Sequence, residues 1–355
     1  MNKLDKKNII VDIERMKYPN TGLYNYCKNL SDFLIKDTTF NYYFFAHKKI
    51  NLPSSIKRIN RKLIDKILLK TSSRFSLWHG TYQTTKFVPI RPIKFVFTIH
   101  DLNFLYEAKS ENKKQKLLNK VQKRVDRADY ITTISKFVLN DVQQHINLSG
   151  KKVKVIYNGV NLVRYPNFKS PSYKPKGKFL FTLGTVLPKK NVHVLLNLLS
   201  KESDCKLLIA GIQPDANYLE KIKKEAKKLD VEHNVVLLGG ISEEEKYWYL
   251  NNCEAFLFPS IAEGFGIPVI EAMLLGKPVF LSTHTSLPEI GGEHAYYFQN
   301  FEPNSMKKVF VKGLKDYKEN NKTNSIINWA EQFTWEKAAE AYINVYKEVL
   351  LLNNE

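Results

Sequence analysis

The sequence predicts an α/β protein of two doubly wound domains, each a parallel sheet covered by helices. Three observations support this prediction. The chain has 355 residues, which is long for one hydrophobic core and natural for two domains of about 150 to 180 residues. Short apolar segments alternate with longer amphipathic ones, as in parallel strands joined by helical crossovers. A stretch rich in proline and serine interrupts this alternation near the middle of the chain.

The first series of apolar segments predicts six strands, with a helix after the first. This helix opens at Pro19-Asn20-Thr21-Gly22-Leu23 and continues with apolar residues at helical spacing. The strands lie near Ile9–Ile13, Tyr42–Ala46, Ser76–His79, Phe95–Ile99, Tyr130–Ile134 and Val153–Ile156. The break that follows, Val163–Gly177, holds three prolines and two serines without an apolar period, which is typical of a linker.

The second series again predicts alternating strands and helices. Its strands lie near Phe179–Gly184, Lys206–Gly211, Val235–Gly239, Ala255–Phe258, Val279–Ser282 and Tyr296–Phe298. Helices are expected at Leu219–Leu229 and Glu243–Asn252, and a final helix at Trp335–Leu352. We therefore expect one domain at residues 1–165, a linker at 166–176 and a second domain at 177–334.

Composition limits the class of protein further. A hydrophobic content of 43% and a charged content of 25% are ordinary for a soluble globular protein. The three cysteines are scattered and form no C-x-x-C pair, which favours a reducing compartment and argues against structural zinc. The amino terminus lacks a signal-peptide pattern, and the longest apolar stretch is interrupted by glutamates and prolines. These features predict a cytoplasmic protein.

The most informative segment, Glu263-Gly264-Phe265-Gly266-Ile267-Pro268-Val269-Ile270-Glu271, places two carboxylates eight residues apart across a glycine-rich turn. Two glutamates at this spacing are commonly only solvated helix charges. Here, however, Gly264 and Gly266 let backbone N–H groups approach an anion at the start of a helix. Each carboxylate can accept hydrogen bonds from two hydroxyl groups. The segment therefore favours a site for a polyhydroxylated phosphate ester.

This segment resembles the E-x7-E signature of retaining GT-B glycosyltransferases, specifically family 4, whose members build bacterial glycans. Further matches follow in the family's order over nearly the whole chain: Ile99-His100-Asp101-Leu102, Ile156-Tyr157-Asn158-Gly159-Val160, Leu183-Gly184-Thr185, Pro188-Lys189-Lys190-Asn191 and Leu287-Pro288-Glu289-Ile290-Gly291-Gly292. The resemblance implies two Rossmann-like domains that face each other across a cleft. The first domain would bind the acceptor, with residues 335–355 crossing back onto it, and the second would bind a nucleotide-sugar donor.

The resemblance also implies an activity, transfer of a hexosyl group from a nucleotide-diphosphate sugar to an acceptor hydroxyl with retention at the anomeric carbon. On this account Glu263 binds hydroxyls of the donor hexose and Glu271 binds the ribose hydroxyls. The segment Gly264, Phe265, Gly266 and Ile267 turns its backbone toward the sugar and the diphosphate. His100 contacts the transferred sugar, and Asp101 orients either His100 or an acceptor hydroxyl.

The diphosphate needs a positive partner, and the sequence offers lysines rather than a metal site. The chain contains no Asp-x-Asp pair, the usual manganese or magnesium clamp of the other major glycosyltransferase fold. Lys189 and Lys190 follow the predicted strand that ends at Gly184. Lys190 matches the family pattern, whereas Lys189 stands where the family commonly has arginine. We expect donor binding by Gly22, Gly184, Lys189 and Lys190, with no metal and no cofactor.

Three of these candidates, Lys189, Lys190 and Gly22, also have a simple structural interpretation. Lysines at a helix start in a lysine-rich chain can be solvated, and Gly22 can be a plain turn residue at a helix entrance. The full dinucleotide fingerprint G-x-G-x-x-G is absent, which argues against a nicotinamide-binding protein.

The formal net charge of +20 lies entirely in the first half of the chain. Residues 1–175 hold 34 lysines and arginines against 12 acidic residues, a surplus of 22, and the remaining 21 basic and 23 acidic residues give −2. Two stretches concentrate the charge, Ser54–Arg74, with Lys62, Lys66 and Lys70, and Lys109–Arg127. Both have the pattern of basic amphipathic helices, which favours an anionic membrane surface as partner. We expect a peripheral protein on the inner face of the cytoplasmic membrane.

Three alternatives to a glycosyltransferase stay open. A nucleotide-sugar epimerase would need no acceptor, and a phosphorylase on the same fold would typically have a pyridoxal lysine and a longer chain. A basic nucleic-acid-binding protein would share the charge, but the chain has no recognised nucleic-acid motif. The donor is also open among several hexoses, with a general likeness to mannosyltransferases around His100 favouring GDP-mannose.

Overall fold

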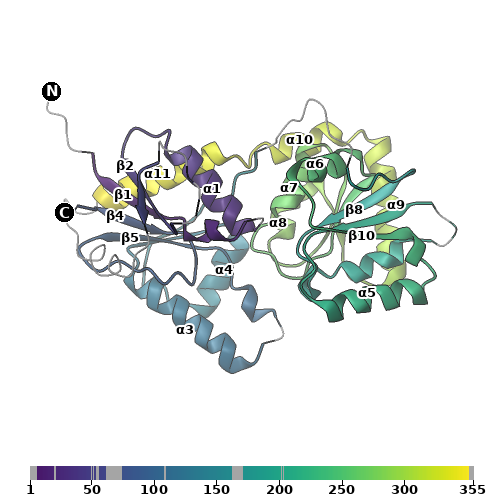
Figure 1. Cartoon of the computed structure of the whole chain (residues 1–355), viewed down its shortest axis with the longest axis horizontal. Coiled ribbons are helices and arrows are strands. Elements are labelled where there is room, and N and C mark those ends of the chain that lie inside the picture. Colours follow the sequence, from purple (N-terminus) through teal and green to yellow (C-terminus); the bar gives the residue numbers. More distant parts are fainter. Residues whose placement is uncertain are drawn as a thin grey trace. The chain divides into compact units, whose positions relative to one another are not determined.

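The computed structural model describes residues 6–19, 21–48, 50, 52, 56–60, 74–107, 109–161, 171–200, 202 and 204–351. The chain divides into two compact units (Figure 1). Unit 1 comprises Met1–Gly159 and Thr334–Glu355, and unit 2 comprises Val160–Phe333. The predicted linker, residues 166–176, falls within the range of unit 2, and its first five residues lie outside the described part of the chain.

Unit 1 contains a seven-stranded parallel sheet in the order β3-β2-β1-β4-β5-β6-β7. The strands are β1 (Asn8–Asp12), β2 (Asn41–Ala46), β3 (Arg58–Asn60), β4 (Leu77–Gly80), β5 (Lys94–Ile99), β6 (Tyr130–Thr133) and β7 (Val153–Val155). Six of them confirm the predicted strands to within one residue at either end. The near-complete burial of β4, β5 and β6 is typical of parallel strands covered on both faces.

The seventh strand corrects the sequence interpretation. The predicted basic helix Ser54–Arg74 is wrong at Arg58–Asn60, which form β3 and pair in parallel with β2. Pairing with β2 gives hydrogen-bond partners to backbone N–H and C=O groups at the edge of the sheet. The β-branched Ile59 also favours an extended strand. Residues 61–73, with Lys62, Lys66 and Lys70, lie outside the described residues.

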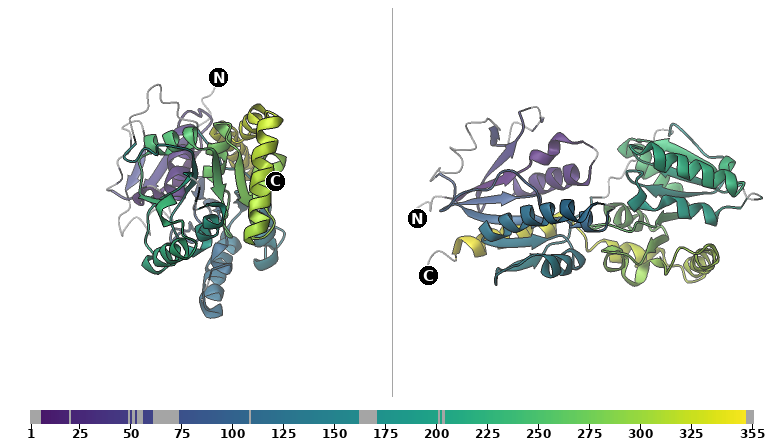
Figure 2. Two further views of the ribbon diagram at one scale, coloured as in Figure 1. Left: turned by 90° about the vertical axis from the view of Figure 1, so that its right-hand side faces the viewer. Right: turned by 90° about the horizontal axis from the view of Figure 1, so that it is seen from below.

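The last helix of the chain belongs to the core of unit 1. Helices α1 (Gly22–Leu34) and α11 (Trp335–Leu351) pack on one face of the sheet, the face from which Ile9 and Val11 of β1 project. Figure 2 shows α11, in yellow, beside the sheet of unit 1. The hydroxyl of Tyr26 donates a hydrogen bond to the hydroxyl of Tyr342 at 2.7 Å. The return of the final helix to the first domain, as the resemblance implies, is therefore confirmed.

The remaining helices of unit 1 lie between successive strands of the sheet. They are α3 (Glu111–Arg127) and α4 (Lys136–His145), with short 3₁₀ helices η1 (Glu14–Lys17) and η2 (Asn103–Leu105). Helix α3 packs against β5 and η2 and buries Val121 and Val125. The predicted basic helix at Lys109–Arg127 is confirmed from Glu111 onward.

Unit 2 contains a six-stranded parallel sheet in the order β10-β9-β8-β11-β12-β13. Its strands are β8 (Phe179–Leu183), β9 (Lys206–Ala210), β10 (Val235–Gly239), β11 (Ala255–Phe258), β12 (Val279–Ser282) and β13 (Tyr296–Phe298). All six confirm the prediction to within one residue. Two parallel sheets with helical connections give the doubly wound α/β architecture that the sequence predicts.

The helices of unit 2 cover both faces of its sheet. Side chains of α5 (Ala216–Lys228), α9 (Pro303–Glu319) and the 3₁₀ helix η4 (Val192–Leu198) share one hydrophobic cluster with β8 and β9. The other helices are η3 (Pro188–Lys190), η5 (Glu232–Asn234), α6 (Glu243–Asn252), α7 (Ile267–Leu274), α8 (Leu287–Gly291), η6 (Gly292–His294) and α10 (Thr323–Ala330). Across the described ranges, no helix combines the length and the apolar character needed to cross a bilayer.

Candidate active site

The predicted site residues lie at the carboxyl edges of the two sheets. In a parallel sheet the carboxyl ends of all strands gather at one edge, where ligands of such folds bind. In unit 1, His100 and Asp101 directly follow β5. In unit 2, Lys189 and Lys190 lie in η3 shortly after β8, and Glu263 lies between β11 and α7. Each unit thus presents one polar cluster at this edge of its sheet.

Lys190 and Glu263, 73 residues apart in sequence, meet directly in unit 2. The Lys190 ammonium donates a hydrogen bond to Glu263 Oε1, and only 16% and 14% of the two side chains are exposed. The ammonium also lies 4.8 Å from the centroid of the Phe258 ring, on its face. The structure therefore brings the strongest phosphate candidate and the strongest sugar candidate of the sequence into one ion pair.

Gly184 lies close to the side chain of this lysine. Its φ of 149° lies in the region that favours glycine, and a Cβ here would stand 3.2 Å from Cε of Lys190. Lys189 lies beside it, half-buried, and its carbonyl accepts a hydrogen bond from the amide of Ile261 at 2.9 Å. This bond joins the loop after β8 to the loop after β11.

The glycine-rich turn between the two glutamates has the conformation that its sequence predicts. Gly266 caps α7 with a φ of 115°, and Ile267 begins the helix with Pro268 in its first turn. Phe265 is buried, its carbonyl accepts a hydrogen bond from Ser286 Oγ at 2.8 Å, and Gly264 is half-buried. The amino end of α7 therefore lies next to Glu263, where the positive end of the helix dipole favours an anion.

Glu271, the second glutamate, is buried and paired with a lysine that the sequence analysis missed. Lys246 Nζ lies 2.6 Å from Glu271 Oε1 and 2.6 Å from Glu243 Oε1. Burial by itself lowers the pKa of a lysine, but the charges of Glu271 and Glu243 outweigh it and raise the pKa of Lys246. Lys246 is therefore charged at neutral pH and holds one oxygen of the predicted ribose-binding carboxylate.

A narrow hollow lies between the carboxyl ends of β8, β9 and β11. It is lined by Gly184, Lys190, Phe258 and Ser260, among others. The hydroxyl of Ser260 is buried and has no hydrogen-bond partner among the described residues. Since a buried polar group without a partner is uncommon, this hydroxyl marks a place where a bound group could complete the hydrogen bonding.

His100 is buried at the carboxyl edge of unit 1 in a defined orientation. Its Nε2 lies 2.9 Å from the carbonyl oxygen of Thr81, and the ring packs against Tyr26 at a centroid distance of 4.5 Å with perpendicular planes. Burial lowers the pKa of His100 to about 4. Because a carbonyl only accepts, the neutral ring carries its proton on Nε2, which leaves Nδ1 as an acceptor.

The other two predictions for unit 1 concern Asp101 and Gly22. Asp101 is half-buried, and its Oδ1 accepts a hydrogen bond from the amide of Asn103 at 3.0 Å, which shapes the start of η2. Gly22 begins α1 behind its cap, Thr21, whose Oγ1 accepts from the amide of Tyr24 at 3.2 Å. Gly22 is exposed and a Cβ there would meet no atom within 4 Å, so the packing of unit 1 does not require glycine at this position.

Several residues around the two clusters were missed because their signals are not local. Thr81, Tyr26 and Lys246 act through partners that lie far away in sequence. Asp12, at the end of β1, could have been found from the sequence, because it is a single acidic residue directly after a run of apolar residues. It is buried, accepts from Thr85 Oγ1 at 2.8 Å, and burial raises its pKa to about 6.

The family match at Asn158-Gly159 also has a structural explanation. A Cβ on Gly159 would lie 2.1 Å from the backbone nitrogen of Trp335 at the start of α11. The Asn158-Gly159 segment therefore permits the return of the final helix.

Among the described residues, no group of three His, Cys, Asp or Glu side chains is placed to hold a metal ion.

Most of the chain matches known protein families. Residues 164–332 match the family described as "Glycosyl transferases group 1", and residues 32–164 match "Glycosyltransferase Family 4". Together the two matches run from residue 32 to residue 332. The chain therefore belongs to the glycosyltransferases and is an enzyme of that class.

Curated relatives include mannosyltransferases. The chain is 27% identical to the serotype-specific mannosyltransferase WbdA of Escherichia coli over 286 residues. The aligned stretch covers 74% of this chain and 34% of WbdA. It is 28% identical over 200 residues to the O-antigen chain mannosyltransferase RfbU of Salmonella typhimurium, covering 56% of this chain and 55% of that one. The chain thus spans about a third of WbdA and about half of RfbU.

Solved structures share the fold over nearly the whole chain. Sucrose-phosphate synthase from Thermosynechococcus elongatus superposes with a TM-score of 0.77 at 16% identity, covering 98% of this chain and all of that one. HepE from Anabaena, solved with UDP and glucose, superposes with a TM-score of 0.73 at 16% identity, covering 96% and 99%. At these identities the likeness shows the fold, GT-B.

Proposed function

We propose that the protein is a retaining, metal-independent glycosyltransferase. It moves a hexosyl group from a nucleoside-diphosphate sugar to a hydroxyl of a lipid-linked or polysaccharide acceptor in bacterial surface-glycan synthesis. The observation that carries this proposal is the meeting of Lys190 and Glu263 at the carboxyl edge of unit 2, beside the amino end of α7. A cation, a carboxylate and the positive end of a helix dipole are groups that suit a sugar diphosphate.

The proposed chemistry assigns one task to each group. Lys190 and the amino end of α7 stabilise the negative charge that develops on the diphosphate as the bond to the anomeric carbon breaks. Glu263 holds hexose hydroxyls, and Glu271 accepts from the ribose hydroxyls. The leaving phosphate oxygen takes the proton of the acceptor hydroxyl, whose oxygen bonds to the anomeric carbon on the same face. Retention then needs no carboxylate nucleophile, the group that a double displacement requires.

For the donor we propose GDP-mannose, because the relatives WbdA and RfbU are named as mannosyltransferases. A thermal-shift panel of GDP, UDP, dTDP and ADP tests this choice. A ligand present at 100 times its Kd stabilises the fold by about 2.7 kcal/mol, whereas the other nucleotides should shift the melting temperature little. Turnover of the donor only after an acceptor is added would separate a transferase from an epimerase. No stabilisation by any of the four would contradict the proposal.

Metal independence is a separate prediction. We expect EDTA to leave the transfer rate unchanged, because Lys190 and the helix amides take the place of a divalent cation at the diphosphate. The rate is measured with and without EDTA, after which magnesium or manganese is added in excess. A strict requirement for added manganese would show that a cation, rather than Lys190, neutralises the leaving group.

Gly22→Ala separates a ligand contact from a turn residue. Alanine forms helices better than glycine by up to about 1 kcal/mol, and a Cβ here meets no atom, so the variant should be at least as stable as the parent. If Gly22 approaches the donor phosphate, the KM for the donor should nevertheless rise several-fold. Thermal unfolding and steady-state kinetics check the two effects. An unchanged KM would make Gly22 a plain turn residue.

His100 should act as a hydrogen-bond acceptor through Nδ1. Asparagine places its amide near Nδ1 and glutamine near Nε2, so His100→Asn should retain several-fold more transfer activity than His100→Gln. The depressed pKa also makes the protein lose stability as the pH falls from about 6.5 toward 4, since the unfolded chain binds the proton first. His100→Asn should reduce this pH dependence, measured by urea unfolding. Equal loss of activity in both variants would contradict the tautomer assignment.

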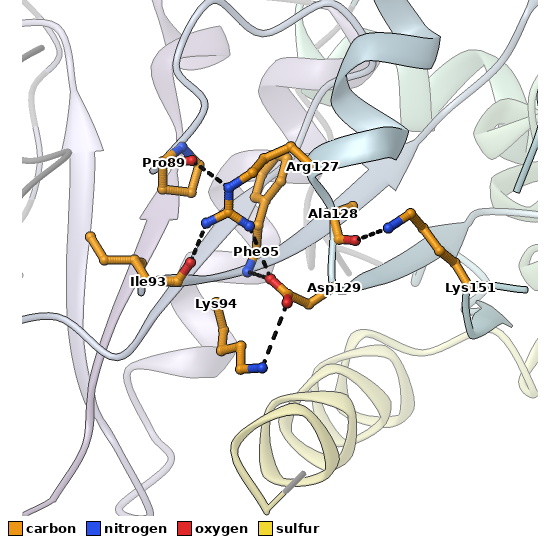
Figure 3. Close-up of polar contacts among 8 residues, drawn as sticks. All are labelled: Pro89, Ile93, Lys94, Phe95, Arg127, Ala128, Asp129 and Lys151. Atoms are coloured by element: carbon orange, nitrogen blue, oxygen red, sulfur yellow. Dashed lines mark hydrogen bonds and ion pairs between the residues drawn. The ribbon is translucent and has the colours of Figure 1, made fainter. Parts of the chain in front are cut away.

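We also propose that the protein works in the cytoplasm, at the inner face of the membrane, with α3 as its contact. Lys113, Lys116, Lys120 and Lys123 are exposed on this helix, and their spacing places them on one face. The arginine at its end serves a different purpose: as Figure 3 shows, Arg127 Nε donates to the carbonyl of Pro89 at 2.8 Å and fixes the helix to unit 1. The lysines are therefore presented by an anchored helix.

A further inference from the structure

We infer that the Lys190–Glu263 ion pair makes the donor site select a nucleoside diphosphate that carries a sugar over one that does not. This inference rests on the proposed function and concerns the same site. It predicts that the enzyme holds its substrate more tightly than its nucleotide product. It also predicts that neutralising Glu263 strengthens product binding while it weakens catalysis.

The two charges satisfy each other when no ligand is bound. Lys190 donates to Glu263 Oε1, and the side chains are 16% and 14% exposed, so water reaches them only partly. The stem of Lys190 passes over Gly184, and its ammonium lies over the Phe258 ring. A charge in such surroundings loses stability if its partner leaves and nothing replaces it.

The backbone around the pair is held independently of it. The amide of Ile261 donates to the carbonyl of Lys189 at 2.9 Å, and the amide of Glu263 donates to Thr285 Oγ1 at 3.0 Å. Ser286 Oγ donates to the carbonyls of Glu263 and Phe265 at 3.2 and 2.8 Å. The ion pair can therefore open by movement of the two side chains, while both loops keep their places.

Opening the pair has different consequences for the two ligands. A bare nucleoside diphosphate takes Lys190 as its counter-ion and leaves the Glu263 carboxylate unpaired next to another anion, which is unfavourable. A nucleoside-diphosphate sugar brings hydroxyl donors along with its phosphates, so Glu263 exchanges one partner for others. Only the sugar-bearing ligand compensates both halves of the broken pair.

The test measures affinities by isothermal titration calorimetry for GDP and GDP-mannose, and for UDP and UDP-glucose, with the parent and with Glu263→Gln. In the parent the sugar nucleotide should bind more tightly than its diphosphate. In Glu263→Gln, Lys190 has lost its counter-ion, and the diphosphate should bind about three- to tenfold more tightly, a gain of roughly 1 kcal/mol. The transfer rate of the same variant should fall. Glu263→Ala, which also removes this counter-ion, serves as a second variant if the first folds poorly.

Glu254→Gln is the matched control. Glu254 also pairs with lysines of unit 2, Lys178 and Lys318, but it precedes β11 and so lies at the opposite end of the strand from Glu263. The Glu254→Gln substitution changes the net charge by the same amount as Glu263→Gln. It should leave the affinities for the diphosphate and for the sugar nucleotide unchanged. Diphosphate binding that is unchanged or weaker in Glu263→Gln would overturn the inference and leave the proposed function standing. If the parent binds none of the four probes, the proposed function itself fails.

Discussion

Replacement of Lys190 by alanine should leave the protein folded and lower the transfer rate by roughly two or more orders of magnitude, the scale of losing one preorganised charge contact. Glu263→Gln should lower it by a similar factor, because the amide cannot hold hexose hydroxyls as a carboxylate does. Thermal unfolding verifies the fold, and kcat and KM for the donor are measured for each variant. Since both residues act on the transition state, the loss should appear largely in kcat.

Two lysines of the same domain serve as controls for this prediction. Lys189→Ala should have a smaller effect, because the variant keeps the backbone carbonyl that joins the two loops and the lysine side chain departs from the family's arginine. Lys178→Ala removes an exposed partner of Glu254 and should leave the transfer rate unchanged. Full activity of Lys190→Ala would remove this residue from the site, and a loss in Lys178→Ala would point to a general effect of charge.

The sheet strands were predictable because parallel strands covered on both faces leave a strong local signal. Runs such as Phe179–Leu183 and Ala255–Phe258 are apolar except for Thr182, and a glycine or a proline follows each of them. Strand β3 carried no such signal: three residues at a sheet edge, two of them polar, owe their conformation to pairing with β2. A basic sequence with isoleucines at helical spacing therefore suggested a helix where tertiary pairing formed a strand.

The candidate site was predictable where a motif determines local geometry. The turn at Gly266 and the start of α7 follow from the sequence alone. The partners of its two glutamates do not, because Lys190 and Lys246 reach them from other loops and helices across 73 and 25 residues. Glu271 illustrates the difference: its place on α7 was predictable, but its burial against Lys246 depends on how α6 packs on α7.

The exposed lysines of α3 should control binding to anionic membranes. Reversal of Lys116, Lys120 and Lys123 to glutamate should weaken binding to anionic liposomes by roughly two orders of magnitude or more, since each near-surface charge contributes about 1 kcal/mol. All three side chains are exposed, and among the described residues none of them is in an ion pair. Binding is measured by liposome sedimentation at increasing salt, which should release the parent protein as screening grows.

A matched reversal of Lys223, Lys227 and Lys228 on α5 distinguishes a specific surface from net charge. These lysines are equally exposed, lie on a helix of unit 2, and change the charge by the same amount. The α5 variant should bind anionic liposomes almost as well as the parent. The α3 variant should keep its affinity for nucleotides and its activity on a soluble acceptor, because its substitutions lie in unit 1 and the donor groups in unit 2. Equal liposome binding by the α3 and α5 variants would show that α3 is an ordinary solvated helix. Salt-dependent retention of the parent protein on DNA, without affinity for nucleotides, would instead favour a nucleic-acid partner.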